Sequence, residues 1–331
     1  MQLSYCLDNS IPGISRKKEG DETVFLDSAG KAVTEAAELD RIRKLAIPPA
    51  WTDVWISPYA HSHLQATGRD AKIRKQYIYH PLWRRLQSDR KFHQLLAFGN
   101  SLPAIRRKTA ADARARGIPR RKVLAVIVIL LDKTLIRIGG KEYVRKNRSY
   151  GLSTLRGDHL SVYTDLMHFH FHGKGGKEID LSVRDPRLAR IIRRLSELSG
   201  QKLFQYYDGR NVHREVDSSE VNEYLSEIAR GDFTAKDFRT WGGTVIAATA
   251  LHEMGPPLSE RDAIKKISKA VETAAGRLVN RPATCLKYYI HPAVMDAYRG
   301  GSLILLFPGS RGRGGRSEAG REGDYAPAGF S

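Results

Sequence analysis

Residues Asn280–Pro292 read NRPATCLKYYIHP, and this short stretch carries more information than any other part of the chain. Its pattern predicts a helix over Pro282–Tyr289 that ends in two adjacent tyrosines. Neighbours on a helix point about 100° apart, so only one of Tyr288 and Tyr289 can face a given ligand. A tyrosine hydroxyl has a pKa of about 10 and needs help to act as a nucleophile.

The tyrosine pair has a structural and a functional interpretation. In the structural one, both rings pack on an amphipathic helix. In the functional one, a tyrosine attacks a phosphodiester, because arginines elsewhere in the chain can neutralise the charge that repels a phenolate. The neighbouring Lys287 adds to that basic setting. The rest of the sequence has to choose between the two.

The composition points to a polyanionic partner. The chain has 331 residues, with 55 Lys and Arg against 36 Asp and Glu, which gives a formal net charge of +19. A surplus of this size attracts nucleic acid, with binding that weakens as salt rises. An RNA-binding or ribosome-associated protein would carry the same charge, so composition alone does not identify the nucleic acid.

Cysteine usage and hydropathy predict a cytoplasmic protein without a membrane partner. Cys6 and Cys285 are far apart in the sequence, so they build neither a zinc motif nor a disulfide framework, and they fit a reducing compartment. The longest apolar run, Val123–Leu131, has nine residues, about half of a membrane span. The first residues form no signal peptide.

The periodicity predicts an α+β protein with two domains and a tail. Residues 1–90 read as a small antiparallel β-rich domain, with strands at Trp51–Ile56 and Gln76–His80 and a turn at 68–70. Residues 91–308 read as a larger, mostly helical domain with a small β-sheet around 152–181. Residues 309–331 are rich in Gly and Arg without a period and are expected to be disordered.

The expected helices follow the 3.6-residue period and its capping signals. They cover Leu82–Leu96, Val123–Ile138, Arg187–Leu198, Ser219–Ala229, Asp237–Glu253, Glu260–Leu278 and Pro282–Tyr289.

Three basic residues are candidate phosphate ligands or acids. Arg137 is expected to close the long apolar helix, where it either complements the helix dipole or presents a rigid phosphate ligand. Lys174 lies in a glycine-flanked turn that lacks the spacing of a nucleotide-binding P-loop and suits a mobile proton donor. Arg239 falls early in a helix, where its charge opposes the dipole unless an anion binds there.

Two other basic or metal-like patterns have weaker support. Histidines alternate with phenylalanines over 168–172, which places the imidazoles on one strand face about 7 Å apart. This spacing is too wide for one metal ion, so we expect a polar face and no metal site. The basic run over 106–122 is either a solvated face or a surface that follows a nucleic-acid backbone.

Taken together, these residues resemble the type IB DNA topoisomerases of the compact poxvirus and bacterial kind. The resemblance is ordered and covers nearly all of residues 30–300. Its motifs are IPPAW at 47–51, QATGRDAK at 65–72, RKQY at 74–77, YH at 79–80, Arg137, YGL at 150–152, Lys174, KDFRTW at 236–241 and the tyrosine segment.

The resemblance implies a mechanism and a catalytic fold shared with the tyrosine recombinases. A tyrosine forms a 3′-phosphotyrosyl link and expels a 5′-hydroxyl, the strand swivels to relax supercoils, and the hydroxyl reseals it without ATP, metal or cofactor. Family motifs assign Arg137 and Arg239 to the phosphate and Lys174 to protonation of the leaving oxygen. The Ile-His-Pro that follows Tyr289 selects it as the nucleophile and leaves Tyr288 without a role.

One position departs from the poxvirus pattern. Those enzymes place a histidine nine residues before the tyrosine, whereas this chain has Asn280 there. The amide can still donate a hydrogen bond to a phosphate oxygen, but it cannot carry a proton. The substitution matches the bacterial branch of the family.

The resemblance also implies a DNA-binding surface in the first domain. It predicts double-stranded DNA as the partner of a monomer that closes as a clamp around the duplex, in the cytoplasm and on the nucleoid. It implies no obligate protein partner. The candidate contacts are Gln65, Arg69, Lys72, Lys75, Gln76, Tyr77 and Tyr79.

Two rival functions remain. A tyrosine recombinase shares the chemistry, but usually carries His-x-x-Arg where this chain has Lys236 three residues before Arg239. A non-catalytic basic protein that binds DNA or RNA would have no use for a complete catalytic set.

Overall fold

The computed structural model describes residues 3–6, 8, 10–19, 22–208, 212–305 and 307. Its contacts divide the chain into an N-terminal unit, Met1–Gln94, and a C-terminal unit, Leu95–Ser331. The helix α2 (Pro81–Asp112) includes the boundary. The expected disordered tail, 309–331, lies outside the described residues.

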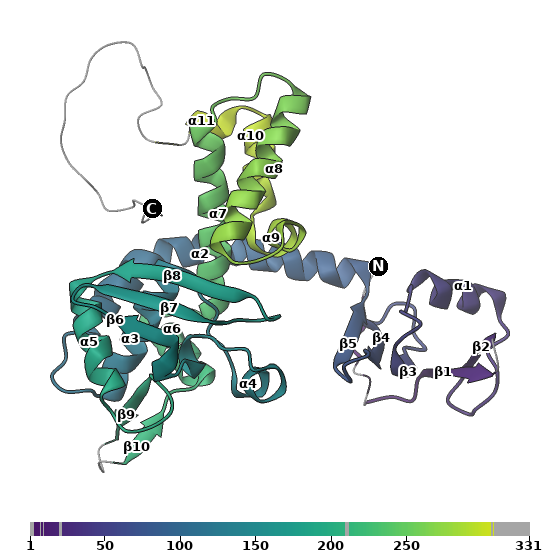
Figure 1. The fold of residues 1–331 in the computed structure, drawn as a ribbon. Coiled ribbons are helices and arrows are strands. Elements are labelled where there is room, and N and C mark those ends of the chain that lie inside the picture. The colour runs from purple at the N-terminus through teal and green to yellow at the C-terminus, as the bar shows by residue number, and fades with distance from the viewer. Residues whose placement is uncertain are drawn as a thin grey trace. The chain divides into compact units, whose positions relative to one another are not determined.

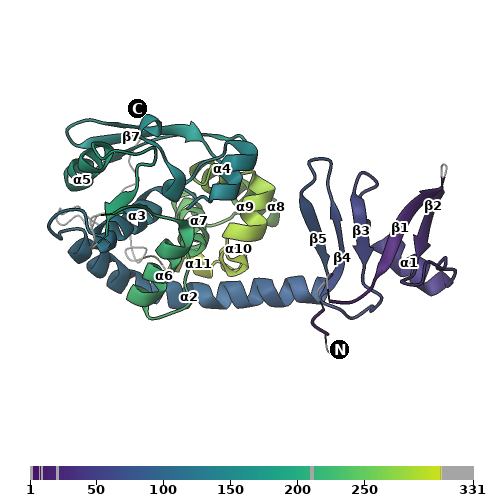
Figure 2. The same cartoon turned by 90° about the horizontal axis from the view of Figure 1, so that it is seen from below.

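The N-terminal unit is built on a five-stranded antiparallel sheet in the order β2-β1-β3-β4-β5. Figure 2 shows these strands, with α1 beside β1 and β2. Their bounds, with those of α1, are β1 Ile14–Glu19, β2 Glu22–Leu26, α1 Ala36–Lys44, β3 Thr52–Ile56, β4 Leu64–Arg69 and β5 Lys75–Tyr79.

Alternation along the strands separates a core face from a polar face. Ile42 of α1, Ile56 of β3 and Ala66 of β4 are almost fully buried in one cluster. On β5 the period of two turns Ile78 toward that cluster and leaves the flanking tyrosines on the other face. The turn predicted at 68–70 lies further along the chain, because Gly68 and Arg69 belong to β4 and still pair with Gln76 and Lys75 of β5.

The C-terminal unit is organised around α3 (Arg120–Thr134), which is apolar on nearly every side. Val123–Val128 are at most 1% exposed, and each valine, leucine or isoleucine side chain among them contributes about 1.5–3 kcal/mol when it leaves water. The helix ends earlier than the predicted 138, because Leu135 adopts a left-handed conformation with φ 55°.

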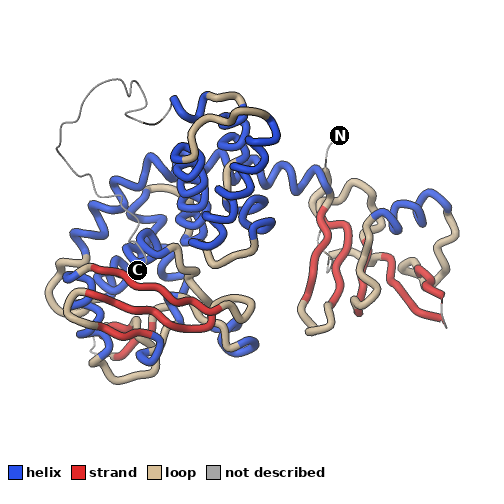
Figure 3. Tube along the Cα trace, turned by 45° about the horizontal axis from the view of Figure 1, so that its top comes forward, coloured by secondary structure: helices blue, strands red, loops and turns tan. Residues whose placement is uncertain are grey.

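Helices and a three-stranded sheet surround α3 (Figure 1), and Figure 3 shows helices in blue and strands in red. The sheet has the antiparallel order β6-β7-β8, and α5 packs against it. The other elements of this unit are α4 Lys141–Asn147, η1 Leu152–Thr154, η2 Gly157–His159, β6 Leu160–Val162, β7 Leu166–His172, β8 Glu178–Arg184, α5 Pro186–Ser196, β9 Gln205–Tyr207, β10 His213–Glu215, α6 Ser218–Ala229, α7 Ala235–Glu253, α8 Glu260–Arg277, α9 Pro282–Tyr289, α10 Pro292–Arg299 and α11 Ser302–Leu305.

Several predicted elements are confirmed. The bounds of α9 match the prediction, and α6 begins one residue before the predicted Ser219. Its first turn is closed by a capping box, in which Asp217 accepts from the backbone N–H of Glu220 and the Glu220 side chain accepts from that of Asp217. The predicted α+β class, with a β-rich first part and a mostly helical second part, is also confirmed.

Candidate active site

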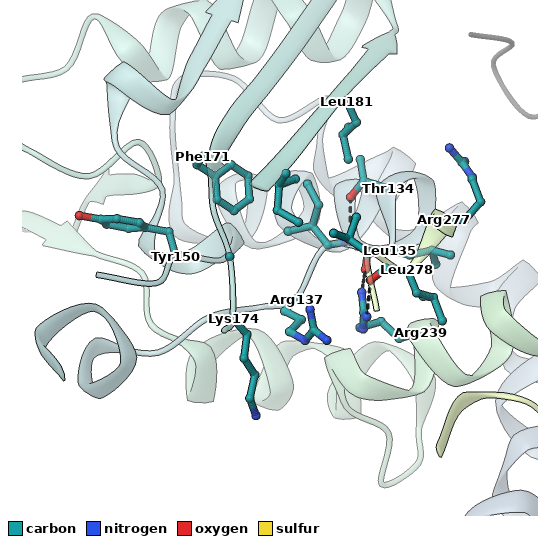
Figure 4. Close-up of a pocket in the computed structure, with 14 residues that line it drawn as sticks. Thr134, Leu135, Arg137, Tyr150, Phe171, Lys174, Leu181, Arg239, Arg277 and Leu278 are labelled. Carbon is teal, nitrogen blue, oxygen red and sulfur yellow. Dashed lines mark hydrogen bonds between the residues drawn. The ribbon is translucent and has the colours of Figure 1, made fainter. Parts of the chain in front are cut away.

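A small pocket in the C-terminal unit is lined by basic side chains from four separate segments. Figure 4 shows Arg137 between Lys174 and Arg239, and Arg277 lines the pocket as well. These residues come from the loop after α3, the β7–β8 turn, α7 and the end of α8. The fold therefore brings together Arg137, Lys174 and Arg239, which the sequence suggested separately.

Arg137 was predicted to close the long apolar helix. It lies instead in the loop that follows α3. Backbone contacts hold this loop: the N–H of Leu152 donates to the carbonyl oxygen of Arg137 at 2.9 Å. Gly151 packs so closely that a Cβ there would collide with the same oxygen and with the backbone of Gly139. The base of the Arg137 side chain is therefore fixed by tertiary contacts.

Arg239, near the start of α7, is a buried cation with 4% of its surface exposed. Its guanidinium donates to the carbonyl oxygen of Leu135 and, at 2.9 Å, to that of Leu278 (Figure 4). Burial, and then the charge of Arg137, lower the pKa of Arg239 to about 10. Its Nε has no hydrogen-bond partner among the described residues, so the group can still bind an anion.

Tyr289, the last residue of α9, lies against this guanidinium. The Cζ of Arg239 is 5.1 Å from the centroid of the Tyr289 ring. Burial raises the pKa of Tyr289, but the positive charges of Arg239 and Arg137 outweigh it, so the pKa is lowered from its usual 10. Tyr288 is 49% exposed, and its ring lies 5.4 Å from the Nζ of Lys287.

Close packing between α7 and α9 sets the position of Tyr289. A Cβ at Gly243 would lie 2.9 Å from the carbonyl oxygen of Tyr289 and 3.0 Å from Leu278. The hydroxyl of Thr244 donates to the same carbonyl at 3.2 Å and accepts from the N–H of His291 at 3.1 Å. The backbone at the end of α9 is thus attached to a side chain of α7.

Lys174 occupies the exposed turn between β7 and β8. Gly175 and Gly176 have φ values of 78° and 71°, which side chains with a Cβ rarely adopt, so the turn requires these glycines. The Nζ of Lys174 lies 5.2 Å from the centroid of the Tyr143 ring, which belongs to α4.

Asn280 follows α8 and presents a hydrogen-bond donor without a partner. Its side-chain oxygen accepts from the N–H of Arg281 at 3.0 Å. Its Nδ2 is buried and makes no hydrogen bond among the described residues. An unsatisfied buried donor costs about 1–3 kcal/mol, so this amide is suited to an external acceptor.

The histidine strand has the two faces that its sequence predicted. Phe169 and Phe171 are buried, whereas the histidines at 168–172 face outward, and His170 contacts Glu178 at 2.7 Å. No three His, Cys, Asp or Glu side chains within the described ranges converge as a metal site.

The basic run over 106–122 is used mainly in ion pairs within its own unit. Its pairs are Arg106–Asp132, Lys108–Asp112, Arg120–Glu220, Arg121–Asp112 and Arg121–Glu227. Lys122 is buried and donates to the carbonyl oxygens of Ala115 and Gly117. Four of the eight basic residues in this run are therefore paired with carboxylates, which lowers the charge of the run without deciding between a solvated face and a surface that follows a nucleic-acid backbone.

In the N-terminal unit, five of the candidate DNA contacts gather at the β4–β5 end of the sheet. Tyr77 stacks on Tyr79 with centroids 6.0 Å apart, and the Nζ of Lys75 lies 5.7 Å from the Tyr77 ring. Arg69 of β4 lies opposite Lys75 of β5 in the strand register, and Lys72 is exposed in the turn between the two strands. Asp53 pairs with Arg69 at 3.1 Å and Asp8 pairs with Lys75 at 2.5 Å, so the charge of these two residues is partly neutralised, while Lys72 and the Tyr77 ring are exposed.

The two glutamines have other surroundings. Gln65 is 3% exposed, accepts from Arg41 at 3.0 Å and donates to the carbonyl oxygen of Ser62 at 2.8 Å. This placement differs from the direct DNA contact that the sequence suggested, because the amide is occupied inside the unit. Gln76 is half-buried and donates to Asp70 at 2.9 Å.

Sequence reasoning missed Arg277, which lines the pocket, and Tyr143, whose ring lies against Lys174. Neither had a local signal, since an exposed tyrosine on a short basic helix and an arginine in a last helical turn both read as solvated surface. Their proximity to Lys174 and to the pocket depends on the tertiary fold.

None of the described helices combines the length and apolar character that a membrane crossing requires.

The chain matches the family model for the catalytic core of eukaryotic DNA topoisomerase I over residues 81–302. It also matches the model for the N-terminal domain of bacterial DNA topoisomerase IB over residues 23–70.

Two viral proteins show the range of similarity. The chain is 30% identical to DNA topoisomerase 1B of Acanthamoeba polyphaga mimivirus over 304 residues, which cover 90% of each protein. It is 24% identical to DNA topoisomerase 1B of vaccinia virus (strain Copenhagen) over 209 residues, or 61% of this chain and 62% of that protein. The chain belongs to the type IB DNA topoisomerase family, and its substrate is DNA.

Proposed function

We propose that this topoisomerase relaxes supercoiled DNA through a transient 3′-phosphotyrosyl break made by Tyr289. The hydroxyl of Tyr289 gives its proton to solvent, and the phenolate oxygen attacks a backbone phosphorus as the bond to the 5′ oxygen breaks. The free end swivels before the 5′-hydroxyl attacks back and displaces the tyrosine. The observation that carries the proposal is the position of Tyr289 against the buried Arg239, with its pKa lowered by two arginines.

The other site residues have distinct tasks in this reaction. Arg137 and Arg239 bind the non-bridging oxygens and stabilise the charge that grows in the transition state. Lys174 protonates the leaving 5′ oxygen, a general-acid task worth roughly 10²–10⁴ in rate. The buried Nδ2 of Asn280 donates a further hydrogen bond to the phosphate.

The proposed reaction needs neither ATP nor a metal. It exchanges one phosphodiester for another, so the bond energy is kept in the phosphotyrosine. Two guanidinium groups supply the charge neutralisation that phosphoryl transfer demands. We also infer that a monomer encloses the duplex in a clamp and that the enzyme acts on the nucleoid.

The polar face of the N-terminal sheet supplies the proposed DNA contacts outside the active site. Arg69, Lys72 and Lys75 bind phosphates, while Tyr77 and Tyr79 offer ring surface to the groove. Gln76 donates one N–H to Asp70, and its amide oxygen and second N–H are the groups that it offers to DNA.

Plasmid relaxation in EDTA without ATP tests the proposal. Wild-type protein should relax supercoiled plasmid, and Tyr289→Phe should not, because the nucleophile is missing. Tyr288→Phe is the matched control and should remain active. Relaxation by Tyr289→Phe would refute the assignment of the nucleophile.

The same assay separates the rival functions. A tyrosine recombinase would join two specific sites, and a non-catalytic binding protein would leave the plasmid supercoiled. A covalent protein–DNA adduct that forms with wild type and is absent with Tyr289→Phe would support the phosphotyrosyl step directly.

A further inference from the structure

The ammonium group of Lys174 rests on an aromatic ring and not on a carboxylate. Its Nζ lies 5.2 Å from the centroid of Tyr143, within the roughly 6 Å range of cation–π attraction. No carboxylate among the described residues pairs with Lys174. The nearest acids of β8 are engaged elsewhere, Glu178 with His170 and Asp180 with His168.

An aromatic partner suits an acid better than a carboxylate would. A lysine on a glycine-rich turn has a long, freely rotating stem, so its ammonium samples many positions unless something holds it. A carboxylate would hold it but would also stabilise the charged ammonium strongly and so oppose the loss of its proton. A ring face attracts the cation and accepts no proton, which leaves the proton available to another base.

The helix that carries Tyr143 is attached to both sides of the pocket. α4 begins directly after the Gly139–Gly140 loop that contains the backbone contacts of Arg137. At its other end, the N–H of Tyr150 donates to the carbonyl oxygen of His172 at 2.9 Å, two residues before Lys174. The backbone that carries Tyr143 is therefore held beside the turn, within reach of Lys174.

We propose that Tyr143 is a positioning residue whose ring holds the ammonium of Lys174 in place for proton transfer. This inference rests on the proposed function, in which Lys174 is the general acid. The Tyr289 hydroxyl gives its proton to solvent, its Oη bonds to phosphorus as the phosphorus–O5′ bond breaks, and O5′ takes one proton from Lys174, which becomes a neutral amine. Religation returns the proton of the 5′-hydroxyl to Lys174, and the released Tyr289 phenolate takes a proton back from solvent.

The ring and not the hydroxyl makes the contact, so two substitutions separate the roles. Tyr143→Phe keeps the aromatic face, whereas Tyr143→Leu keeps only apolar volume. Tyr163, also exposed but remote from this contact, provides the control Tyr163→Leu. Loss of an exposed cation–π contact predicts a roughly two- to fivefold slower cleavage in Tyr143→Leu.

Leaving-group chemistry gives a readout that a structural role would not change. Single-turnover cleavage is measured on a duplex with the normal 5′ oxygen and on one with sulfur at that bridging position. A thiolate, whose conjugate acid has a pKa of about 8.5, leaves without a proton from the enzyme. Tyr143→Leu should therefore be slow on oxygen and normal on sulfur, while Tyr143→Phe and Tyr163→Leu should match wild type on both.

Several results would overturn the proposal. Equal slowing of both substrates by Tyr143→Leu would indicate a role in binding or folding, and a Tyr143→Phe defect as large as that of Tyr143→Leu would assign the effect to the hydroxyl. No slowing on oxygen would also refute it. In a Lys174→Ala background, Tyr143→Leu should add nothing.

The same experiment tests the underlying assignment separately. Lys174→Ala should lose roughly 10²–10⁴ in rate on oxygen and recover on sulfur. A Lys174→Ala variant that stays slow on sulfur would show that Lys174 is not the acid, which is a failure of the proposed function and not of the Tyr143 contact alone.

Discussion

At the scale of single residues, the site places a weak nucleophile in a strongly positive environment. Tyr289 is half-buried, which favours the neutral phenol, yet the nearby guanidinium groups favour the phenolate. The second effect wins because Arg239 is itself buried, where the interaction between charges is less screened. Binding of a phosphate would compensate the cationic charge that Arg239 and Arg137 leave unneutralised.

This balance predicts the pH dependence of cleavage. Since the pKa of Tyr289 is lowered and the phenolate is the attacking form, the single-turnover rate should rise with pH and pass its inflection below pH 10. The charge of Lys236 also lowers the pKa of Tyr289, so Lys236→Gln should move the inflection to higher pH. A cleavage pH profile measures both.

The control for this shift is Lys269→Gln, which removes an exposed lysine of α8 that does not act on Tyr289. Its profile should coincide with that of wild type. An inflection that moves to lower pH in Lys236→Gln, or that moves equally in both variants, would contradict the electrostatic explanation.

At the scale of elements, the contact between α7 and α9 determines whether Tyr289 reaches the phosphate. Gly243→Ala should push α9 away, because the new Cβ would lie 2.9 Å from the carbonyl oxygen of Tyr289. Overpacking of this kind costs about 1–3 kcal/mol, so we expect a lower melting temperature and slower cleavage. Calorimetry and single-turnover cleavage test the two effects.

Gly276→Ala is the matched helical control. No atom lies within 4 Å of the added Cβ, and alanine favours the helix over glycine by about 1 kcal/mol. The control should melt at the same or a slightly higher temperature and cleave normally. If Gly243→Ala behaved in the same way, the close packing of α7 and α9 would not control the nucleophile.

The elements also show what the sequence can and cannot predict. α9 could be predicted to the residue, because its helical pattern is short and clear and its neighbours break the helix. The end of α3 could not, because apolar residues continue through Ile136 and Ile138 and conceal the left-handed turn at Leu135. α4 was not predicted at all, since its residues form no apolar stripe and its attachment to the pocket is tertiary.

The same limit applies to individual site residues. Family motifs suggested Arg137, Lys174 and Arg239, and the fold brings them to one pocket. A family motif likewise suggested Gln65 as a DNA contact. Its amide is instead occupied by hydrogen bonds with Arg41 and with the carbonyl oxygen of Ser62. A side chain's chemistry can be read from the sequence, but its exposure depends on contacts between distant segments.

At the scale of the whole molecule, net charge overstates the surface available to DNA. The chain carries +19, but much of the basic run over 106–122 is paired with carboxylates in its own unit. Exposed surface pairs contribute little to stability, about 0–1 kcal/mol each, so their main effect here is to neutralise charge. Unpaired basic residues elsewhere, including Lys72 on the N-terminal unit, should carry more of the binding.

This difference can be measured through the salt dependence of DNA binding. The logarithm of the association constant falls with the logarithm of salt concentration by about 0.9 for each neutralised phosphate. Lys72→Gln should therefore reduce that slope by about one, because Lys72 is exposed and has no ion pair among the described residues. Arg120→Gln should leave the slope unchanged, since Arg120 already pairs with Glu220 at 2.8 Å.

Fluorescence anisotropy of a labelled duplex measures these slopes, and the use of the Tyr289→Phe protein avoids cleavage during the titration. A smaller slope in Arg120→Gln together with an unchanged slope in Lys72→Gln would mean that DNA lies over the paired surface and not over the N-terminal sheet.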